Sequence, residues 1–271
     1  MAREARGIQS IEVSGRILKA LVERCKPMML KELAQEAALA PAQCHAYLTS
    51  MRHVGLVHQD AQTGHYQTGA FAMRLGISWL ESSPVASRAI HALKKLTDET
   101  GAMSTLSVWS TAGPTIVHIN SGVTPTALNL RQGSVFSTTG TATGRVFSAF
   151  DNVEAVRRQI DDELNTPGGS NRSIGITLLR DEFEDWMERT REQGYSTAFG
   201  APIPDVNAVA APIFDADGKL VFVATLIGPS DELPVDAASG EVRKLLDVTR
   251  AMSSNANAPE KPGHRNPEED A

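Results

Sequence analysis

The segment 39–69 constrains the fold more than any other part of the chain. It predicts a helix that begins at Pro41 and stops at Gly55, because proline suits a first helical position and glycine suits the residue past a helix end. Two short strand-like runs follow, 56–59 and 65–68, with Asp-Ala-Gln-Thr-Gly between them. A helix followed by such a two-stranded ribbon is the outline of a winged helix.

Two further helices are expected before this segment. Apolar residues recur at helical intervals in "IQSIEVSGRILKALVER", with Ser10 as the expected N-cap and Pro27 as the stop. The run "LKELAQEAA" predicts a second helix. Three helices and a ribbon make a winged helix-turn-helix over 7–69. The inward face of its third helix is expected to be formed by Cys44, Leu48 and Met51.

Charge is divided unevenly along the chain. The whole sequence has 26 Lys and Arg against 32 Asp and Glu, a net charge of -6. Residues 1–80 hold nine basic and six acidic side chains, whereas residues 81–271 hold 17 and 26. A mildly basic first part suits a polyanionic partner, and an acidic remainder does not. The acidity of the whole chain therefore does not exclude nucleic acid as a partner of the first part.

A linker helix and a second, larger unit follow the winged segment. The run 70–83 has a helical pattern that stops near Pro84. Beyond it, the clearest signal is a hairpin over 206–229 around Asp-Ala-Asp-Gly. Helices mixed with hairpin-like strands predict an α+β unit over 84–252, with an antiparallel sheet flanked by helices. Its other expected elements are strands at 103–109, 115–122 and 126–131, and helices at 84–101, within 137–150, and at 152–164, 179–193 and 236–254.

Composition argues against several classes of protein. The two cysteines, Cys25 and Cys44, are too few for a disulfide framework or a metal cluster, and they are expected to be reduced core thiols in the cytoplasm. No apolar run reaches the ~18 residues of a membrane helix, and no signal peptide opens the chain. Neither a metal nor a cofactor is expected. The polar stretch 253–271 is expected to be a disordered tail.

The assembled pattern resembles the IclR family of bacterial transcriptional regulators. The resemblance covers about 7–250 and rests on "GIQSIEVSGRIL", "LAPAQCHAYLTSMRHVGLV", "GHYQTG" and "GYSTAFGAPIPDVNAVAAPIFDADGKLVFVATLIGP". It implies an N-terminal winged helix-turn-helix, a linker helix and a C-terminal effector domain of GAF-like fold. It also implies a homodimer or homotetramer that binds palindromic operator DNA, senses a small organic acid and controls a catabolic operon.

The start and outward face of the third helix supply candidates for DNA contact. A recognition helix enters the major groove N-terminus first. Gln43 can make two hydrogen bonds to adenine, and Arg52 can pair with a phosphate. The wing and the beginning of the first helix add others. The predicted DNA-binding set is Arg6, Ala42, Gln43, His45, Ala46, Thr49, Ser50, Arg52, His65 and Gln67.

This helix departs from the family pattern in its charge. The family often has lysine or arginine where Pro41 stands and arginine where Ala46 stands, and a Ser-Thr pair in place of Ala42 and Gln43. Each phosphate contact that is lost means that roughly one counterion fewer is released on binding, so the affinity depends less steeply on salt. One winged helix-turn-helix domain (one head of the oligomer) is therefore expected to bind DNA weakly. A symmetric oligomer whose heads span two half-sites would supply the affinity.

The segment "STTGTATGRVFSAF" predicts a site for an anion. Small residues and hydroxyls at a helix start leave backbone N–H groups free, and the helix dipole adds partial positive charge. The segment lacks the spacing and the lysine of a P-loop, and tight packing of the helix on the sheet is the structural alternative. The family places its ligand against this loop. The resemblance implies an effector site formed by Leu128, Phe136, Thr141, Ala142, Thr143, Ala198, Val206, Ala208, Thr225 and Ile227.

Several positions of this site also depart from the family. Where Ala201, Ala208 and Ile227 stand, the family tends to have an acidic residue, a cysteine or serine, and a serine, and it tends to have a glycine in place of Asp205. Apolar side chains thus replace polar ones around the expected pocket. Such a pocket favours an aromatic or otherwise apolar acid over one the size of glyoxylate.

Two other functions stay open at this stage. A winged helix with so few Lys and Arg residues can be a protein-interaction module joined to a sensory domain. A small-molecule enzyme would need a nucleophile with a nearby histidine and acid. The histidines beyond residue 83 are His91, His118 and His264, and no GxSxG, HExxH or CxxC motif is present. His118 is expected on a strand as a packed or surface residue.

Overall fold

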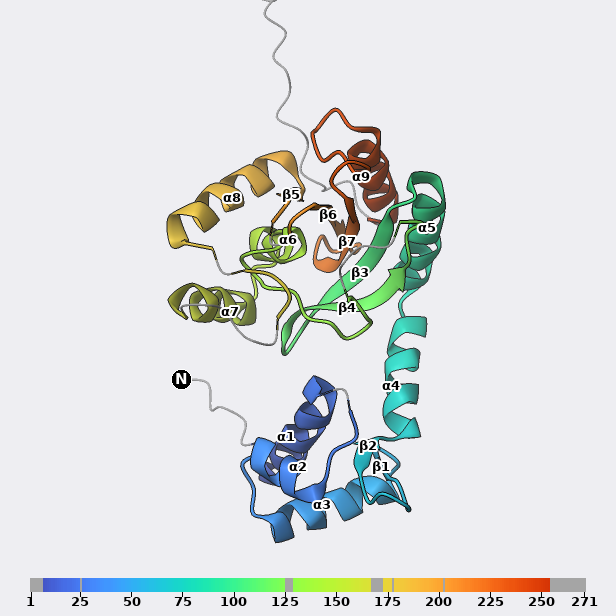
Figure 1. The fold of residues 1–271 in the computed structure, drawn as a ribbon, viewed down its shortest axis with the longest axis vertical. Helices are drawn as coiled ribbons and strands as arrows, with labels where there is room; N and C mark the ends of the chain where they lie inside the picture. The colour runs from blue at the N-terminus through green and yellow to red at the C-terminus, as the bar shows by residue number, and fades with distance from the viewer. Residues whose placement is uncertain are drawn as a thin grey trace, which may run out of the picture. The chain divides into compact units, whose positions relative to one another are not determined.

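The computed structural model describes residues 7–24, 26–124, 129–166, 173–176, 178–201 and 203–253. The chain divides into two compact units, Met1–Ser83 and Pro84–Ala271 (Figure 1). Each unit has its own apolar core, so each is described by itself.

The first unit is a winged helix-turn-helix followed by a further helix. Its elements are α1 Gln9–Arg24, α2 Leu30–Glu36, α3 Pro41–His53, β1 Val57–Gln59, β2 Tyr66–Thr68 and α4 Ala70–Glu81. The strands β1 and β2 pair antiparallel as the wing. Cys44, Leu48 and Met51 are all buried in the core between the three helices, which confirms the predicted inward face of α3.

The ends of two helices test the expected capping residues. Pro41 is the first residue of α3, and Gly55 follows its end with φ of 75°, a left-handed conformation that glycine adopts readily. The expected N-cap Ser10 is wrong, because α1 already begins at Gln9. The carbonyl of Ile8 accepts the N–H of Ile11 at 2.9 Å, so the first turn closes before Ser10 can act as a cap.

Helix α4 buries none of its residues within a single chain. Its apolar side chains are exposed at every turn, namely Phe71, Met73, Leu75, Ile77 and Trp79. A helix of this composition is stabilised only weakly by its own chain, because packing against a core normally supplies most of the stability of a helix. Within a single chain, α4 therefore gains little stability from burial of its apolar side chains.

The second unit is an antiparallel sheet with helices on both faces, as predicted. Its strands are β3 Met103–Ser110, β4 Gly113–Asn120, β5 Ser196–Phe199, β6 Val206–Phe214 and β7 Leu220–Pro229, in the order β4-β3-β7-β6-β5. Its helices are α5 Pro84–Thr100, α6 Ala142–Phe150, α7 Glu154–Asn165, α8 Arg180–Gln193 and α9 Gly240–Met252. Helices α5 and α9 pack on one face of the sheet, while α6 lies on the other with α7 and α8 beside it (Figure 1).

The hairpin of β6 and β7 forms the centre of this sheet. The predicted turn is present, with Gly218 at φ of 75° and the N–H of Lys219 bonded to the Asp215 carboxylate at 2.9 Å. Val223 packs in one apolar cluster with Val146 and Phe147 of α6. Since side chains alternate along a strand, every second residue after Val223 also faces α6. This alternation decides which residues of β7 can line a site beside that helix.

The strand predicted over 126–131 is wrong for its described part. Residues 129–131 are not in a strand, and 126–128 lie outside the described residues. The N–H of Ser134 bonds to the carbonyl of Arg131 at 3.0 Å, which turns the chain back toward β4. Phe136 then donates its N–H to the carbonyl of Pro114 at 2.8 Å. The segment after Arg131 therefore runs along the edge of the sheet.

Candidate functional site: an anion-binding cavity and a DNA-facing helix

A cavity opens beside the N-terminus of α6. It encloses about 420 Å³, including the part open to solvent. The residues that line it are Phe136, Thr141, Ala142, Thr143, Ile174, Ala198, Ala201, Ile203, Val206, Ala208, Thr225 and Ile227. A cavity of this size suits a small organic molecule.

Thr141 shapes the polar end of the cavity as the N-cap of α6. Its Oγ1 accepts the N–H of Gly144 at 3.0 Å and donates to the carbonyl of Ser137 at 2.8 Å. No described residue accepts a hydrogen bond from the N–H of Ala142 or of Thr143, although both residues are only 2% exposed. Two free N–H groups at the positive end of a helix dipole form a site suited to a carboxylate.

Hydroxyl groups continue this polar end onto the sheet. Thr143 Oγ1 lies 2.8 Å from Thr225 Oγ1, and both side chains are buried. Thr225 pairs with Thr105 of β3, whose buried hydroxyl has no partner among the described residues. Of these residues, Thr143 and Thr225 line the cavity, so the site has hydroxyls that donate or accept beside backbone groups that only donate.

Two glycines allow the chain to pack tightly around this end. A side chain at Gly144 would place its Cβ 2.1 Å from the carbonyl oxygen of Ser137. A Cβ at Gly140 would lie 1.8 Å from the carbonyl oxygen of Ile176. Backbone blocks both approaches, so neither can be relieved by turning a flexible side chain. The glycines of the "TGTATG" stretch are therefore needed for close packing of the backbone.

Nine of the ten residues predicted for the effector site lie around this cavity: Phe136, Thr141, Ala142, Thr143, Ala198, Val206, Ala208, Thr225 and Ile227. The tenth, Leu128, lies outside the described residues. The wall also includes Ile174, Ala201 and Ile203, which the predicted set omits. Ile174 reaches the cavity because its N–H bonds to the carbonyl of Val135 at 2.8 Å. That pairing joins segments almost forty residues apart, and no local pattern reveals it.

Arg145 places a buried positive charge in the first turns of α6. It is 3% exposed, its Nε donates to Ser196 Oγ at 3.0 Å, and its guanidinium lies 4.1 Å from the ring centroid of Trp186. Within the described part of the chain it forms no ion pair, and burial lowers the pKa of Arg145 to about 10. Its guanidinium contacts Ser196, Thr197 and Trp186, and Arg145 is not among the residues that line the cavity. Sequence reasoning missed Arg145, because a lone arginine in an amphipathic helix is expected on the solvated side.

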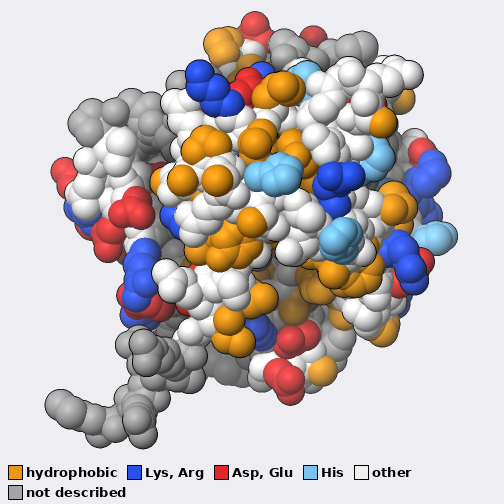
Figure 2. All heavy atoms as spheres, turned by 90° about the horizontal axis from the view of Figure 1, so that it is seen from below, with side chains coloured by type: hydrophobic (Ala, Val, Ile, Leu, Met, Phe, Trp, Pro, Cys, Tyr) orange, Lys and Arg blue, Asp and Glu red, His pale blue; other side chains and the backbone are white. Residues whose placement is uncertain are grey.

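The predicted DNA-facing residues of α3 share one surface. Ala42, Gln43, His45, Ala46, Ser50 and Arg52 are exposed, and Thr49 is half-buried. On the wing, Gln67 is exposed and His65 is half-buried, whereas Arg6 lies outside the described residues. Figure 2 shows one face of the structure, on which several histidines lie beside apolar and uncharged side chains. The surface is thus largely neutral.

Several of these side chains already have partners within the chain. Thr49 Oγ1 donates to the carbonyl of His45 at 2.9 Å, and Ser50 Oγ donates to that of Ala46 at 3.3 Å. A hydroxyl that donates internally can only accept, so it must rotate before it can donate to a phosphate. Arg52 Nη1 donates to Gln59 Oε1 at 2.9 Å, and Gln59 Nε2 donates to the carbonyl of Gly64 at 3.1 Å. Gln59 therefore ties the single arginine of α3 to the wing.

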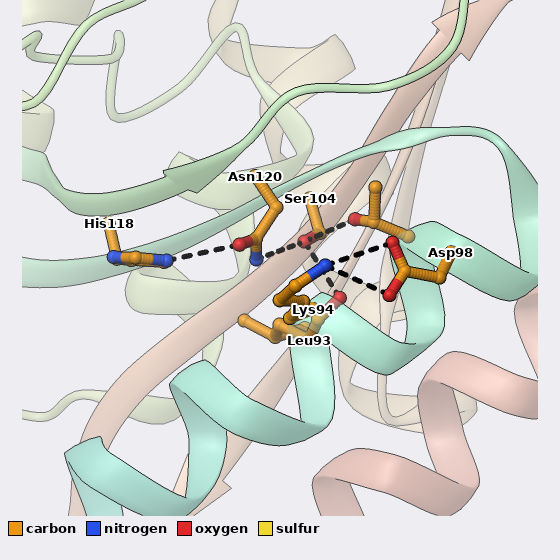
Figure 3. Close-up of polar contacts among 7 residues, drawn as sticks. Leu93, Lys94, Asp98, Ser104, His118 and Asn120 are labelled. Carbon is orange, nitrogen blue, oxygen red and sulfur yellow. Dashed lines mark hydrogen bonds and ion pairs between the residues drawn. The ribbon is translucent and has the colours of Figure 1, made fainter.

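His118 belongs to a structural hydrogen-bond network on the other side of the sheet (Figure 3). Its Nε2 lies 3.2 Å from Asn120 Oδ1, and Asn120 Nδ2 donates to Ser104 Oγ at 3.0 Å. The hydroxyl of Ser104 donates to the carbonyl of Leu93 at 3.1 Å, and the carboxylate of Asp98 pairs with Lys94 rather than with His118. The network joins strands to α5 and contains no nucleophile held by a histidine and an acid.

Two absences hold for the described residues. No group of three or more His, Cys, Asp or Glu side chains among them is placed to hold a metal ion. No helix among them is long and apolar enough to cross a membrane.

A winged helix joined to a sheet domain with its own cavity is the architecture of a transcriptional regulator with an effector domain. Two family models match the chain: "IclR helix-turn-helix domain" over residues 10–61 and "Bacterial transcriptional regulator IclR C-terminal" over residues 77–254. The protein therefore belongs to the IclR family. The homologues are transcriptional regulators and not enzymes, so the enzyme alternative is set aside.

Three relatives illustrate how far the similarity extends. The glycerol operon regulatory protein of Streptomyces coelicolor is 29% identical over 262 residues, which are 94% of this chain and 98% of that protein. The crystal structure of Pseudomonas aeruginosa HmgR is 31% identical, covers 91% of this chain and 97% of its own, and gives a TM-score of 0.55. An IclR homologue of Microbacterium hydrocarbonoxydans, complexed with 4-hydroxybenzoate, has the same fold, with 15% identity, a TM-score of 0.73, and coverage of 90% and 98%.

Proposed function

We propose that the protein binds palindromic operator DNA and that its cavity senses a small aromatic or otherwise apolar carboxylate, thereby controlling a catabolic operon. The observation that carries the proposal is the pair of N–H groups of Ala142 and Thr143, which have no acceptor among the described residues. Buried N–H groups without partners are rare in native structures, because each costs free energy. A ligand carboxylate would satisfy both.

The walls of the cavity define the rest of the ligand. The lining also contains an apolar cluster that includes Phe136, Ile174, Val206 and Ile227. Burying the apolar part of a ligand against such walls contributes about 25 cal/mol per Å². A two-carbon acid such as glyoxylate gains little from them, whereas a benzene ring gains much. The 4-hydroxybenzoate bound by the Microbacterium hydrocarbonoxydans homologue supports an acid of this class.

On the DNA side, Gln43 is proposed as the base-reading residue of α3. It lies exposed in the first turn of the helix, where the residues of a recognition helix meet base edges. His45, Arg52, His65 and the other predicted residues would contact the sugar-phosphate backbone. With one arginine in α3, each head would bind weakly, so two heads linked in a dimer or tetramer would supply the affinity.

The exposed apolar helix α4 supports the oligomer in this proposal. Contact with a second copy would cover the side chains that a single chain leaves exposed, Phe71 and Trp79 among them. Because α4 follows the winged helix directly, it is proposed as the linker that transmits the ligand state to the spacing of the heads. Such coupling requires the ligand to bind one spacing more tightly than the other. The site of action would be the cytoplasm, where operator DNA is located.

Two measurements test the proposal. Thermal-shift assays should show that benzoate and 4-hydroxybenzoate stabilise the protein and that pyruvate and glyoxylate do so less. A response to the short acids alone would contradict the aromatic class. Fluorescence anisotropy with a labelled palindromic duplex from the upstream region of the neighbouring operon should show steeply salt-dependent binding that the effective acid modulates. A protein-interaction module would show no such binding.

A further inference from the structure

The carboxylate of Glu163 is buried beside the loop that leads into α6. Glu163 lies near the end of α7, is 4% exposed, and forms no ion pair within the described residues. Its charge is instead met by hydrogen bonds. Oε1 accepts the N–H of Thr138 at 2.8 Å, and Oε2 accepts the N–H of Thr139 at 3.1 Å. A carboxylate that accepts two adjacent N–H groups holds the backbone between them in one orientation.

Two hydroxyls complete the environment of this carboxylate. Oε2 lies 3.1 Å from Thr139 Oγ1 and 2.9 Å from Ser137 Oγ. Thr138 and Thr139 therefore supply three donors to one side chain of α7, while the single hydroxyl proton of Ser137 is shared between Glu163 and the carbonyl of Ile176, which lies 2.8 Å from Ser137 Oγ. A buried charge persists only when its partners compensate for lost solvation, so the arrangement ties α7 firmly to this loop.

A relay of hydrogen bonds connects this loop to the cavity. Ser137 Oγ accepts the N–H of Gly140 at 3.0 Å, and the carbonyl of Ser137 accepts Thr141 Oγ1 at 2.8 Å. Thr141 Oγ1 in turn accepts the N–H of Gly144 and so caps α6. The position of Ser137 thus sets the side chain that begins the helix. The free N–H groups of the next two residues take their direction from that helix start.

We propose that Glu163 is a positioning residue of the effector site. Its carboxylate takes up the N–H groups of Thr138 and Thr139 and orients the loop, so that the N–H groups of Ala142 and Thr143 stay free and face the cavity. The Glu163 carboxylate thereby binds the first two N–H groups of this segment, and the carboxylate of the ligand binds the other two. The inference rests on the proposed function of the cavity, and it adds a residue that does not itself touch the ligand.

The local sequence places Glu163 at this point for a physical reason. Val156 is buried on α7, and Glu163 follows it by seven residues, close to two helical turns, so both face inward. A glutamate at an inward position is costly unless it has partners. The polar run Ser137–Thr139 supplies these partners, and it could not be matched to α7 without the tertiary structure.

The test compares Glu163→Gln with Glu154→Gln in the full chain. Glutamine keeps one acceptor but turns an NH2 group toward donors, whereas Glu154 is an exposed residue of the same helix that pairs with Arg158. Isothermal titration calorimetry with benzoate and with uncharged benzamide gives the preference for the carboxylate. Glu163→Gln should weaken benzoate binding roughly tenfold and benzamide binding little, because hydrogen bonds to a charged group are the stronger ones. Glu154→Gln should match the wild type.

A second variant keeps the test decisive if Glu163→Gln does not fold. Thr139→Val removes one donor to Oε2 and leaves the backbone N–H in place, so it should lower the benzoate preference in the same direction by a smaller factor. Equal loss of benzoate and benzamide binding, or an unchanged preference in both variants, overturns the role of Glu163. If the wild type binds neither benzoate, 4-hydroxybenzoate nor pyruvate, the proposed function itself fails, and the positioning role fails with it.

Discussion

Helices α3 and α6 are both proposed to present their N-termini to an anion, but in opposite surroundings. Ala40 precedes α3 without a side-chain cap, Pro41 has no N–H, and Ala42 and Gln43 are exposed. Thr141 caps α6, whose first residues are buried. An exposed helix terminus contributes about 0.3–1 kcal/mol and is screened by salt, whereas a partly buried one reaches ~2 kcal/mol. Backbone groups can therefore dominate binding at α6, while binding at α3 depends on side chains and on the number of heads.

The largest expected effect is that of Gly144→Ala, which would destroy the buried terminus. A Cβ at this position would clash with backbone of Ser137 and Thr138, so α6 must shift. We expect a loss of about 1–3 kcal/mol in the free energy of unfolding, together with loss of benzoate binding. Chemical denaturation and calorimetry measure both. As a control, Gly15→Ala in α1 meets nothing within 4 Å and should stabilise the protein by up to ~1 kcal/mol.

The next effect concerns sequence reading at the exposed terminus. If Gln43 contacts a base, Gln43→Ala should reduce the preference for operator over unrelated duplex about tenfold, with little change in affinity for the unrelated duplex. Competition binding at constant salt measures both affinities. Equal losses on the two duplexes would show that Gln43 does not read a base. Gln62, exposed on the wing turn, offers a matched glutamine control.

A smaller effect is expected from the single arginine of α3. Arg52→Ala should lower the slope of log affinity against log salt by about 0.9 for each head, because one phosphate contact is lost. Gln59→Ala, which frees Arg52 from the wing, should leave that slope nearly unchanged. A salt titration of duplex binding distinguishes the two variants. An unchanged slope in Arg52→Ala would remove Arg52 from the DNA-contact surface.

The smallest expected effect is a pH dependence of the local stability of the wing. Hydrogen bonds from the N–H and hydroxyl of Thr63 and the N–H of Gln62 lower the pKa of Asp60 below its ordinary 3.8. Because the folded pKa is the lower one, the stabilisation is present above pH 3.8 and is lost as the pH falls through the folded pKa. Carboxyl chemical shifts measured by NMR should show this midpoint, and Thr63→Ala should raise it.

The elements of the fold could be predicted because their signals are local. Helical periodicity places Cys44 and Leu48 inward on α3, and the turn around Gly218 predicts the hairpin. Residues 129–131, expected to be in a strand, show the limit of such reasoning, because an apolar run next to a turn does not reveal whether it pairs with another strand. Local patterns therefore locate elements better than they identify strand partners.

The residues of the site also fall into two groups, those with a local sequence signal and those without one. Position in the "TATG" turn and alternation along β7 bring Thr141, Thr143 and Thr225 to one cavity, and resemblance to the family pointed to the same residues. Ile174 and Glu163 carry no comparable signal. Each reaches the site through hydrogen bonds to residues far away in the chain, Ile174 to Val135 and Glu163 to Thr138.

Periodicity, capping and turn residues are properties of neighbouring residues, and they settle the two-part architecture and the helix start that can receive an anion. Which donors at that start stay free is a property of the packed chain. Thr138 and Thr139 lose their N–H groups to Glu163, while Ala142 and Thr143 keep theirs, although all four residues belong to one short polar stretch. The physical reason is that a hydrogen-bond donor is used or left free according to the acceptor that folding brings to it.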